Sequence, residues 1–430
     1  MILPANASVI EVGCGDGELL AMLKPKDRVG VDISGKQVAL AHQNNPDLEF
    51  VQQSGEELQM DRKFDYIILS ETVNFAADVQ AMFEQLHRVS HSSTKILINF
   101  HSALWRPLFF LGTVFRVKAK QPQCNWLTVG DLRNMLNLAG WEVIKVQPRI
   151  LCPVYLVGFE AFFNKLIAPL LPWLCLTNFC IARKTGKASK DSHSVSILIP
   201  ARNEAGNIEN GIKRIPKFGC HQEVIIVEGN STDNTWEVIQ KIGEKFPERN
   251  IKILQQSGIG KGNAVREGFD VATGDILMIL DADFTMPPEE LPKYYNVLAN
   301  GQGDFANGVR LVYPMDDKAM RFLNLCANKL FGITFSWLLS QSIRDTLCGT
   351  KVLFRKDYLK IVENRSYFGD FDPFGDFDLL FGADKLNLKI TDVPIRYKDR
   401  TYGETNISRF RHGILLFRMV FFAARKLKFV

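Results

Sequence analysis

Residues 276–283 read Ile-Leu-Met-Ile-Leu-Asp-Ala-Asp, an apolar run that ends on two carboxylates separated by one residue. Two similar runs lie upstream, Val-Ser-Ile-Leu-Ile at 195–199 and Glu-Val-Ile-Ile-Val-Glu-Gly at 223–229. Each is short, apolar and bounded by Gly, Pro or polar residues, which is the pattern of a strand buried in a parallel sheet. The carboxyl ends of parallel strands meet at one edge, so the polar residues that follow are predicted to line a ligand site.

The N-terminal half of the chain has the same rhythm in a different sequence. Its strand patterns are short apolar runs that alternate with helical stretches. They lie at 8–13, 28–34, 48–52, 64–70, 95–100 and 141–147. No internal repeat relates the two halves, so they are separate domains rather than a duplication. The predicted fold class is α/β, with two Rossmann-like domains that are each built on a parallel sheet.

A polar segment rich in small and charged residues separates the two rhythms, Lys-Thr-Gly-Lys-Ala-Ser-Lys-Asp-Ser-His-Ser at 184–194. This composition is typical of a linker. The predicted organisation is therefore a first domain at 1–183, a linker at 184–194, a second domain at 195–411 and a basic tail at 412–430. A length of 430 residues also exceeds the usual size of a single hydrophobic core.

Composition narrows the possible classes of function. The eight cysteines form no Cys-x-x-Cys pair, so neither a zinc site nor a disulfide framework is expected. A net charge of +5 is modest for this length. The sequence has no platform of aromatic and basic residues, so nucleic acid is not expected as a partner. The first residues lack the basic and apolar regions of a secretory signal, so both domains are expected to be cytoplasmic.

Three segments are apolar without reaching an uninterrupted run of about 18 residues, which a spanning helix needs. Residues 150–182 are interrupted by prolines and charges, and residues 319–343 have an amphipathic pattern. The tail after residue 407 carries Lys and Arg but no Asp or Glu, which suits a helix lying on anionic lipid. Peripheral association with the inner face of the cell membrane is therefore expected.

The stretch from Glu11 to Gly17, Glu-Val-Gly-Cys-Gly-Asp-Gly, falls between a strand and a helix, where glycines let a ligand approach the backbone. Asp32 ends the next strand, where a carboxylate can accept both hydroxyls of a ribose. These two motifs resemble those of class I S-adenosylmethionine-dependent methyltransferases over residues 1–183. The resemblance implies S-adenosylmethionine as cofactor and a substrate-side loop near Ser70 and Glu71. It implies cofactor contacts at Glu11, Gly13, Gly15, Gly17, Asp32, Ser54 and Glu56.

Methyl transfer depends on alignment of the nucleophile with the methyl group, so no catalytic base is assigned. His87, His91 and His101 are left outside the predicted site. The alternative is that this domain is a noncatalytic scaffold, and its methyl acceptor stays open.

The three acidic strand ends of the second half, together with Gly-Lys-Gly-Asn-Ala at 260–264, resemble glycosyltransferase family 2 enzymes of the GT-A fold. The likeness extends over 195–411 and is greatest to the dolichyl-phosphate mannosyltransferase type. It implies that Asp281 and Asp283 hold Mg²⁺ or Mn²⁺ against the diphosphate of a nucleotide-sugar. It implies donor contacts at Pro200, Ala201, Asn203, Glu204, Glu228, Asp233, Lys261, Asp281 and Ala282.

Downstream segments match the acceptor side of the same family. Arg310 and the segment 345–351 are in this part, and the acceptor phosphate is expected to contact Arg396, Lys398, Arg400 and Thr405. Asp376 or Asp378 is a base, a sugar-binding residue or a helix cap, and the sequence leaves these three roles open. The predicted catalytic residues are Asp283, Asp376, Asp378 and Arg310.

These features together predict an inverting transfer of sugar from a nucleotide-sugar to a polyprenyl phosphate at a membrane surface, fused to a methyltransferase. The apolar stretch 319–343 is expected to form interfacial helices, with a buried core helix as the alternative. Transfer to a hydroxyl of a polysaccharide is the competing hypothesis for the reaction.

Overall fold

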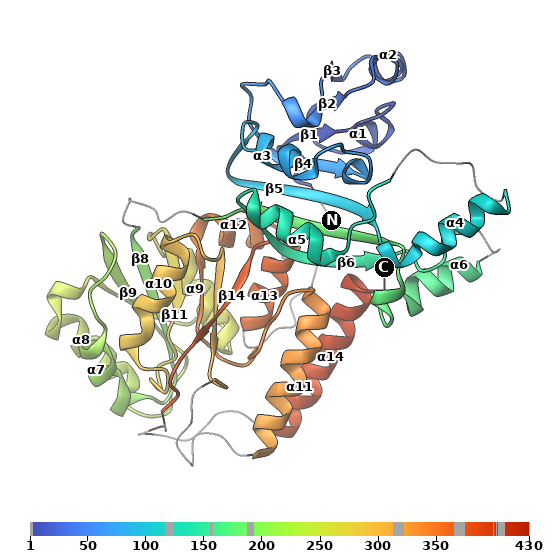
Figure 1. Ribbon diagram of the computed structural model, residues 1–430. Helices are drawn as coiled ribbons and strands as arrows, with labels where there is room; N and C mark the ends of the chain where they lie inside the picture. The colour runs from blue at the N-terminus through green and yellow to red at the C-terminus, as the bar shows by residue number, and fades with distance from the viewer. Residues whose placement is uncertain are drawn as a thin grey trace. The chain divides into compact units, whose positions relative to one another are not determined.

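The computed structural model describes residues 3–116, 124–154, 158–186, 193–312, 322–364, 375–398, 400, 402 and 409–429. Its contacts divide the chain into two compact units. Unit 1 comprises Met1–Thr185 with Lys428–Val430, and unit 2 comprises Gly186–Leu427. Each unit contains one seven-stranded sheet with helices around it (Figure 1).

The sheet of unit 1 has the strand order β3-β2-β1-β4-β5-β7-β6. Its strands are β1 Ser8–Val12, β2 Asp27–Asp32, β3 Glu49–Gln52, β4 Phe64–Ser70, β5 Ser90–His101, β6 Trp141–Arg149 and β7 Thr177–Lys184. Strand β7 is antiparallel to both of its neighbours, β5 and β6, while the other described strands run parallel to one another. The strands β1 to β6 therefore all end at the same edge, where β7 begins.

The described helices of unit 1 are α1 Glu18–Met22, α2 Gly35–Asn44, α3 Val79–Gln85, α4 Arg106–Val114, α5 Val129–Leu138 and α6 Phe159–Phe162. Three of these described helices, α2, α3 and α5, begin at a capping side chain. Thr128 and Asp131 form a capping box at the start of α5, which satisfies two backbone N–H groups that the helix leaves open. In the core, the indole of Trp141 is fully buried and donates a hydrogen bond to the Phe83 carbonyl at 2.9 Å.

The sheet of unit 2 has the order β10-β9-β8-β11-β13-β12-β14. Its strands are β8 Val195–Ala201, β9 Gln222–Glu228, β10 Ile251–Gln255, β11 Ile276–Ile279, β12 Phe305–Val309, β13 Lys351–Phe354 and β14 Ile390–Pro394. Here β13 is the antiparallel member among the described strands. The runs that the sequence marked as strands at 195–199, 223–229 and 276–280 lie next to one another in the middle of this sheet.

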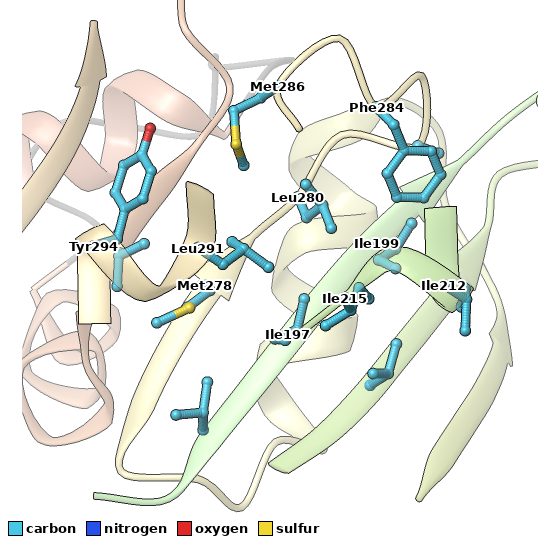
Figure 2. Packing of buried hydrophobic residues seen from close by; sticks show 14 of the residues in the cluster. Ile197, Ile199, Ile212, Ile215, Met278, Leu280, Phe284, Met286, Leu291 and Tyr294 are labelled. Atoms are coloured by element: carbon cyan, nitrogen blue, oxygen red, sulfur yellow. The ribbon is translucent and has the colours of Figure 1, made fainter. Parts of the chain in front are cut away.

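Helices pack on both faces of that sheet. They are α7 Ala205–Arg214, α8 Thr235–Lys245, α9 Lys261–Asp270, α10 Leu291–Ala299, α11 Phe322–Leu339, α12 Arg355–Glu363, α13 Asp376–Lys385 and α14 Arg409–Leu427. Figure 2 shows the core on one face, where Ile197 and Ile199 of β8 pack with Met278 of β11 and Ile212 of α7. Burying one such side chain contributes about 1.5–3 kcal/mol, so this cluster fixes the strand ends that carry the polar loops.

The predicted α/β class with two Rossmann-like sheets is confirmed, and each sheet differs from a purely parallel one by a single antiparallel strand. In unit 1 that strand, β7, begins within the apolar stretch 150–182 and runs past its end, so the stretch divides into a surface part and a largely buried strand. None of the described helices combines the length and apolar character needed to cross a bilayer.

Helix α11 has two kinds of surface. Phe335 is buried and its ring stacks on Phe381 of α13 at 5.5 Å, which is core packing. Ile333 is 71% exposed on the same helix, and Phe421 is exposed on α14. The rings of Phe331 and Phe417 lie 5.3 Å apart, so α11 and α14 pack together. Helix α11 therefore has buried side chains, as the core-helix alternative requires, and exposed apolar ones. Its role as an interfacial helix stays a prediction.

Candidate active sites

The glycine loop of unit 1 leaves β1 with three residues in the left-handed region. Gly13, Gly15 and Gly17 have φ of +80°, +54° and +80°. A Cβ on Gly13 would lie 2.6 Å from Thr72 Oγ1, and one on Gly17 would lie 2.6 Å from the Phe50 ring. A Cβ on Gly15 would meet nothing within 4 Å. Side chains of the unit thus pack tightly against Gly13 and Gly17. The Gly15 backbone faces open space, in which a ligand can approach it.

Three carboxyl groups surround this loop. Glu11 is 2% exposed, and one of its oxygens, Oε2, has no hydrogen-bond partner among the described residues. Burial, together with the charges of Asp32 and Asp16, raises the pKa of Glu11 to about 8. The Asp32 carboxylate accepts hydrogen bonds from the backbone N–H of Gly15 at 2.9 Å and of Ser34 at 2.8 Å. The carboxylates of Asp16 and Asp32, beside a Glu11 carboxyl that can lose its proton when a cation binds, suit a cationic ligand.

Two of the predicted cofactor residues, Ser54 and Glu56, contact each other. The hydroxyl of Ser54 donates to Glu56 at 2.6 Å, and Glu56 accepts from the backbone N–H of Ala77 at 2.9 Å and of Asp78 at 3.2 Å. The hydrogen bond from Ser54 is the largest cause that lowers the pKa of Glu56. Glu56 therefore ties the loop after β3 to the residues that precede α3.

His101 is a candidate that sequence reasoning left out. It is the last residue of β5, at the same sheet edge as the glycine loop, and its Nε2 lies 3.9 Å from a carboxylate oxygen of Glu71. His87 stacks on Trp141 and His91 pairs with Asp65, so these two have structural contacts. The position of His101 directly after the strand pattern 95–100 was the signal that could have separated it from the other two.

In unit 2, side chains after β8 and β9 connect two neighbouring loops. Strand pairing places Ala201 opposite Glu228. Glu228 accepts from the backbone N–H of Ser231 at 2.6 Å, and Asn203 accepts from that of Thr232 at 2.8 Å. Asp233 accepts from the N–H of Thr235 at 3.0 Å, next to the start of α8. The predicted donor residues of these two strands therefore lie at one edge of the sheet.

Of the other predicted donor residues, Pro200 lies at the end of β8, and the side chains of Ala201 and Ala282 belong to the hydrophobic core. These two alanines can therefore offer a nucleotide only backbone atoms.

A lysine and two carboxylates meet where β11 ends. The Lys261 ammonium lies 2.8 Å from Asp281 and 3.6 Å from Asp376. Burial would raise the pKa of Asp281, but the charge of Lys261 outweighs it and holds that pKa below its usual value. Burial would likewise lower the pKa of Lys261, and the two carboxylates hold it above its usual value. Both groups are thus charged at neutral pH.

Arg400 connects the predicted acceptor segment to the predicted donor side. One terminal nitrogen donates to Asp283 and the other to Glu204, each at 2.8 Å. Burial raises the pKa of Glu204 against the opposing effect of Arg400. A single guanidinium therefore joins three residues that are far apart in the sequence.

The remaining acceptor-side residues have different surroundings. Arg310, at the end of β12, forms a buried pair with Asp345 through hydrogen bonds of 2.7 and 2.8 Å. Arg396 and Lys398 are exposed, and Thr405 lies outside the described residues. Asp378 is half-buried in the first turn of α13, whose first residue is the buried Asp376.

Two further residues of this site were not predicted individually. A Cβ at Gly349 would overlap the Asp281 carboxylate and the Lys261 ammonium, so only glycine lets the backbone approach this pair. Lys351 is fully buried and donates to the Cys348 carbonyl. Both residues lie in the polar segment 345–351, and their closeness there was the sequence feature that could have identified them.

The described residues contain no group of three or more His, Cys, Asp and Glu side chains arranged to hold a metal ion. Asp281 and Asp283 supply two carboxylates at one strand end. Mg²⁺ is commonly held by one or two carboxylates together with substrate phosphates, so this donor set fits a divalent ion that binds with a nucleotide.

Comparison with protein families gives one match in each unit. The family described as Glycosyl transferase family 2 matches residues 196–362, and the one described as Methyltransferase domain matches residues 10–98. Among solved structures, a glucosyl-3-phosphoglycerate synthase from Mycobacterium tuberculosis is 18% identical with a TM-score of 0.41, over 55% of this chain and 80% of that one. An S-adenosylmethionine-dependent methyltransferase from Mesorhizobium loti is 18% identical with a TM-score of 0.34, over 42% of this chain and 94% of that one.

Three curated relatives match the glycosyltransferase part. The glycosyltransferase AglJ of Haloferax volcanii is 30% identical over 226 residues, which are 52% of this chain and 70% of the relative. A dolichol-phosphate mannosyltransferase of Pyrococcus furiosus is 38% identical over 120 residues, 27% of this chain and 33% of the relative. An undecaprenyl-phosphate 4-deoxy-4-formamido-L-arabinose transferase of Edwardsiella ictaluri is 22% identical over 230 residues, 53% of this chain and 66% of the relative.

The chain thus spans between 33% and 70% of the length of these relatives. The likeness to AglJ covers most of that protein and agrees with the family match over β8 to α12. The chain belongs to the family 2 glycosyltransferases, and it carries a second unit whose sequence matches the methyltransferase domain.

Proposed function

We propose that the chain transfers a sugar, with inversion, from a nucleotide-sugar to a polyprenyl phosphate at the cytoplasmic face of the membrane. The observation that carries the proposal is the pairing of Arg400 with Asp283 and Glu204, because it joins a residue of the predicted acceptor segment to two residues predicted to contact the donor. The names of relatives that act on dolichol phosphate and undecaprenyl phosphate support this acceptor class.

The donor side would hold a divalent ion at Asp281 and Asp283. Mg²⁺ or Mn²⁺ bound there would offset the negative charge that develops on the leaving nucleoside diphosphate. Lys261 and Arg400 each pair with one of these carboxylates, so two fixed positive charges lie beside the place of the diphosphate. Preorganised charges of this kind stabilise a developing anion without a cost of reorganisation.

Direct displacement accounts for inversion. An oxygen of the acceptor phosphate forms a bond to the anomeric carbon while the bond from that carbon to the diphosphate oxygen breaks on the opposite side. A phosphate is already ionised at neutral pH and needs no strong base. The positive side chains Arg396, Lys398 and Arg400 are the residues proposed to attract it, and a guanidinium can bind a phosphate through two hydrogen bonds.

Contact with the membrane is proposed for α11 and α14. Ile333 and Phe421 present exposed apolar side chains there, and Arg425 and Lys426 add positive charge at the end of α14. An amphipathic surface with basic flanks binds anionic lipid without spanning the bilayer. This arrangement would hold the acceptor site near a lipid whose phosphate lies at the interface.

The test is nucleoside diphosphate release from a panel of nucleotide-sugars, measured with Mg²⁺ or Mn²⁺ and a polyprenyl phosphate. We expect release that depends on the lipid phosphate and is lost in Asp283→Asn. Glu209→Gln is the matched control, because it also removes one carboxylate but only from an exposed pair with Lys245. Release that requires no lipid phosphate would contradict the acceptor assignment.

Sugar transfer to a polysaccharide hydroxyl is a second candidate, favoured by one observation. Asp376 is buried beside Lys261 rather than on the surface, so a carboxylate that could act as a base lies next to a residue predicted to contact the donor. A hydroxyl acceptor would require this base, and Asp376→Asn would then abolish transfer. A phosphate acceptor would tolerate the change.

For unit 1 we infer S-adenosylmethionine-dependent methyl transfer. The sulfonium and ammonium groups of S-adenosylmethionine are cations. Asp16 and Asp32 provide complementary negative charge, and the buried carboxyl of Glu11 beside them can release its proton when a cation binds. The open space at Gly15 leaves room for the ligand. Isothermal titration with S-adenosylmethionine tests this inference, and absence of binding would favour the noncatalytic scaffold.

A further inference from the structure

Unit 1 has an unusually long connection between two neighbouring strands. β6 and β7 are adjacent and antiparallel, and Arg149 at the end of β6 is opposite Thr177 at the start of β7. Antiparallel neighbours can be joined by a two-residue turn, yet residues 150–176 intervene here. This connection leaves the sheet at the edge where β1 and β5 end, which is the edge of the glycine loop and His101.

A second segment leaves the same edge directly after β5. It comprises residues 103–116 and includes α4, none of whose residues is buried although most are apolar. The β6–β7 connection has the same character, because α6 and the helical turn Phe163–Ile167 also contain no buried residue. In Figure 1 these helices extend away from the sheet. A helix that is apolar on all sides is normally covered by something other than water.

The exposed apolar side chains of the described chain are concentrated in these two segments, which hold nearly half of the large ones. Phe110 is 68% exposed and Trp173 is 67% exposed. The other members are Leu104, Leu108, Leu111, Val114, Phe115, Ile150, Val154, Phe159, Phe162, Phe163, Leu166, Leu170 and Leu171. A concentration of exposed apolar side chains of this kind marks an interaction site.

Specific hydrogen bonds hold the two segments in place. The indole of Trp105, just before α4, donates to the Leu174 carbonyl at 2.8 Å. Asn164 accepts from the backbone N–H of Leu151 and of Cys152, each at 2.8 Å, and donates to the Cys152 carbonyl. The exposed apolar side chains therefore lie on segments whose backbone is held by specific hydrogen bonds. We name these segments together the apolar platform and define it as residues 103–116, 150–154 and 158–176.

We propose that the apolar platform inserts into the interface of an anionic lipid bilayer and that unit 1 methylates a lipid-borne acceptor there. The positive charge of the platform favours anionic lipid over the other partners that could cover an apolar surface. The platform carries Arg106, Arg116 and Lys165 against a single acid, Glu160, whose carboxylate accepts from the N–H of Gly158. Exposed Phe and Trp with basic flanks are the composition of helices that lie in a lipid interface.

The acceptor class follows from the shared sheet edge and rests on the proposed S-adenosylmethionine site. His101 contacts Glu71, and its ring lies 5.6 Å from the ring of Phe109 in α4, so the platform reaches the reaction edge. A hydroxyl oxygen of the lipid attacks the methyl carbon, and the bond from sulfur to that carbon breaks with its electron pair left on sulfur. The hydroxyl proton passes to the imidazole of His101. The products are a methyl ether and S-adenosylhomocysteine.

Docking is tested by hydrogen–deuterium exchange of the full-length chain with and without phosphatidylglycerol vesicles. We expect amides of 106–114 and 159–167 to exchange severalfold more slowly with vesicles, because lipid covers both helices. The double variant Phe110→Ser/Phe162→Ser should lose this local protection. Leu138→Ser is the matched control, since Leu138 is 63% exposed in the same unit but lies outside the platform, and it should behave as the parent chain.

The local readout separates the platform from the proposed tail of unit 2, which can bind vesicles by itself. Equal exchange in both helices with and without vesicles would overturn the proposal. So would protection that appears at high protein concentration without lipid, since a second copy of the chain would then cover the surface. Unchanged affinity of the double variant for S-adenosylmethionine shows that unit 1 is still folded.

The acceptor class is tested with S-adenosylmethionine labelled in its methyl group and membranes of the native organism. Label in the chloroform–methanol extract, reduced at least about tenfold in the double variant and unchanged in Leu138→Ser, is the expected result. Label confined to the aqueous phase would refute a lipid-borne acceptor. Failure to bind S-adenosylmethionine at all would remove the methyl-transfer assignment, and the exchange experiment would still decide the docking.

Discussion

The ammonium nitrogen of Lys261 lies 2.8 Å from the carboxylate of Asp281, so this proposed metal ligand is neutralised by a cation of the chain itself, as Asp283 is by Arg400. A divalent ion arriving without a nucleotide has to displace this contact. The diphosphate of a nucleotide offers Lys261 another anionic partner. Metal and nucleotide are therefore expected to strengthen each other's binding.

Lys261→Met separates these two effects. Without nucleotide, the variant should bind Mn²⁺ roughly three- to tenfold more tightly. The metal then no longer has to displace the ion pair between Lys261 and Asp281, which is worth ~1 kcal/mol. With uridine or guanosine diphosphate present, binding should weaken, since the cation that attracts the diphosphate is gone. Electron paramagnetic resonance of free Mn²⁺ measures both. Lys293→Met, at an exposed pair with Glu290, is the control, and equal changes with and without nucleotide would contradict the argument.

The buried pair of Arg310 and Asp345 predicts a large loss of stability when it is broken. Asp345→Asn leaves the guanidinium buried without its counter-charge, which costs about 3–5 kcal/mol. Urea denaturation of unit 2 should show this loss. Arg214→Ala breaks a more exposed pair with Glu289 and should cost under about 1 kcal/mol. Similar costs for the two variants would mean that burial of the first pair has no energetic effect.

Gly349→Ala should impair the donor site with little loss of fold. The added methyl group overlaps the Asp281 carboxylate and the Lys261 ammonium, so both must move. We expect at least a tenfold weaker affinity for nucleoside diphosphate with Mn²⁺, by roughly 1.4 kcal/mol or more in titration calorimetry. Gly130→Ala in α5 is the control, because a Cβ there has its nearest neighbour at 3.5 Å. A normal affinity in Gly349→Ala would show that the pair is not needed in this position.

We expect cofactor binding to release a proton from the carboxyl of Glu11. Its pKa of about 8 keeps the carboxyl protonated at pH 7 in the free protein, and a cationic ligand favours the carboxylate. Binding at pH 7 should therefore release close to one proton. Calorimetry in buffers of different ionisation enthalpy measures that number, and Glu11→Gln should release none. Proton release that persists in this variant would assign the linkage to another group.

The same group predicts a dependence of stability on pH. The folded state holds the Glu11 proton up to about pH 8, whereas a carboxyl with the ordinary pKa of 4.5 loses it much earlier. Between these values the folded state binds more protons, so the free energy of unfolding should fall as pH rises. Urea denaturation from pH 5 to 9 should show a shallower fall in Glu11→Gln. An identical profile would place the pKa of Glu11 near its ordinary value.

The sequence was sufficient to predict strands that are apolar and bounded by turns, such as β1, β8, β9 and β11. Strand patterns failed for β12, because its buried Asn307 is polar. Its amide nitrogen donates to the Asp345 carbonyl and to the Asp392 carboxylate, from segments distant in the sequence. Strand β7 escaped notice for the opposite reason, since it continues an apolar stretch whose other part stays on the surface.

The candidate sites show a similar division. Carboxylates at strand ends, such as Asp281 and Asp283, could be predicted from sequence because parallel strands bring their ends together. The pairing of Arg400 with Glu204 could not, since it depends on the path of the chain between residues that are 196 positions apart. The approach of Gly349 to Lys261 is equally a product of tertiary packing.

The length of the β6–β7 connection bears on how substrate range can change during evolution. Because Arg149 and Thr177 keep their pairing whatever lies between them, residues can be added or removed there without altering the register of the sheet. Closing a loop of twice the length costs only about 0.6 kcal/mol more. Related chains can therefore acquire or lose this segment in small steps, each of them nearly neutral for folding, while the cofactor edge beneath it stays the same.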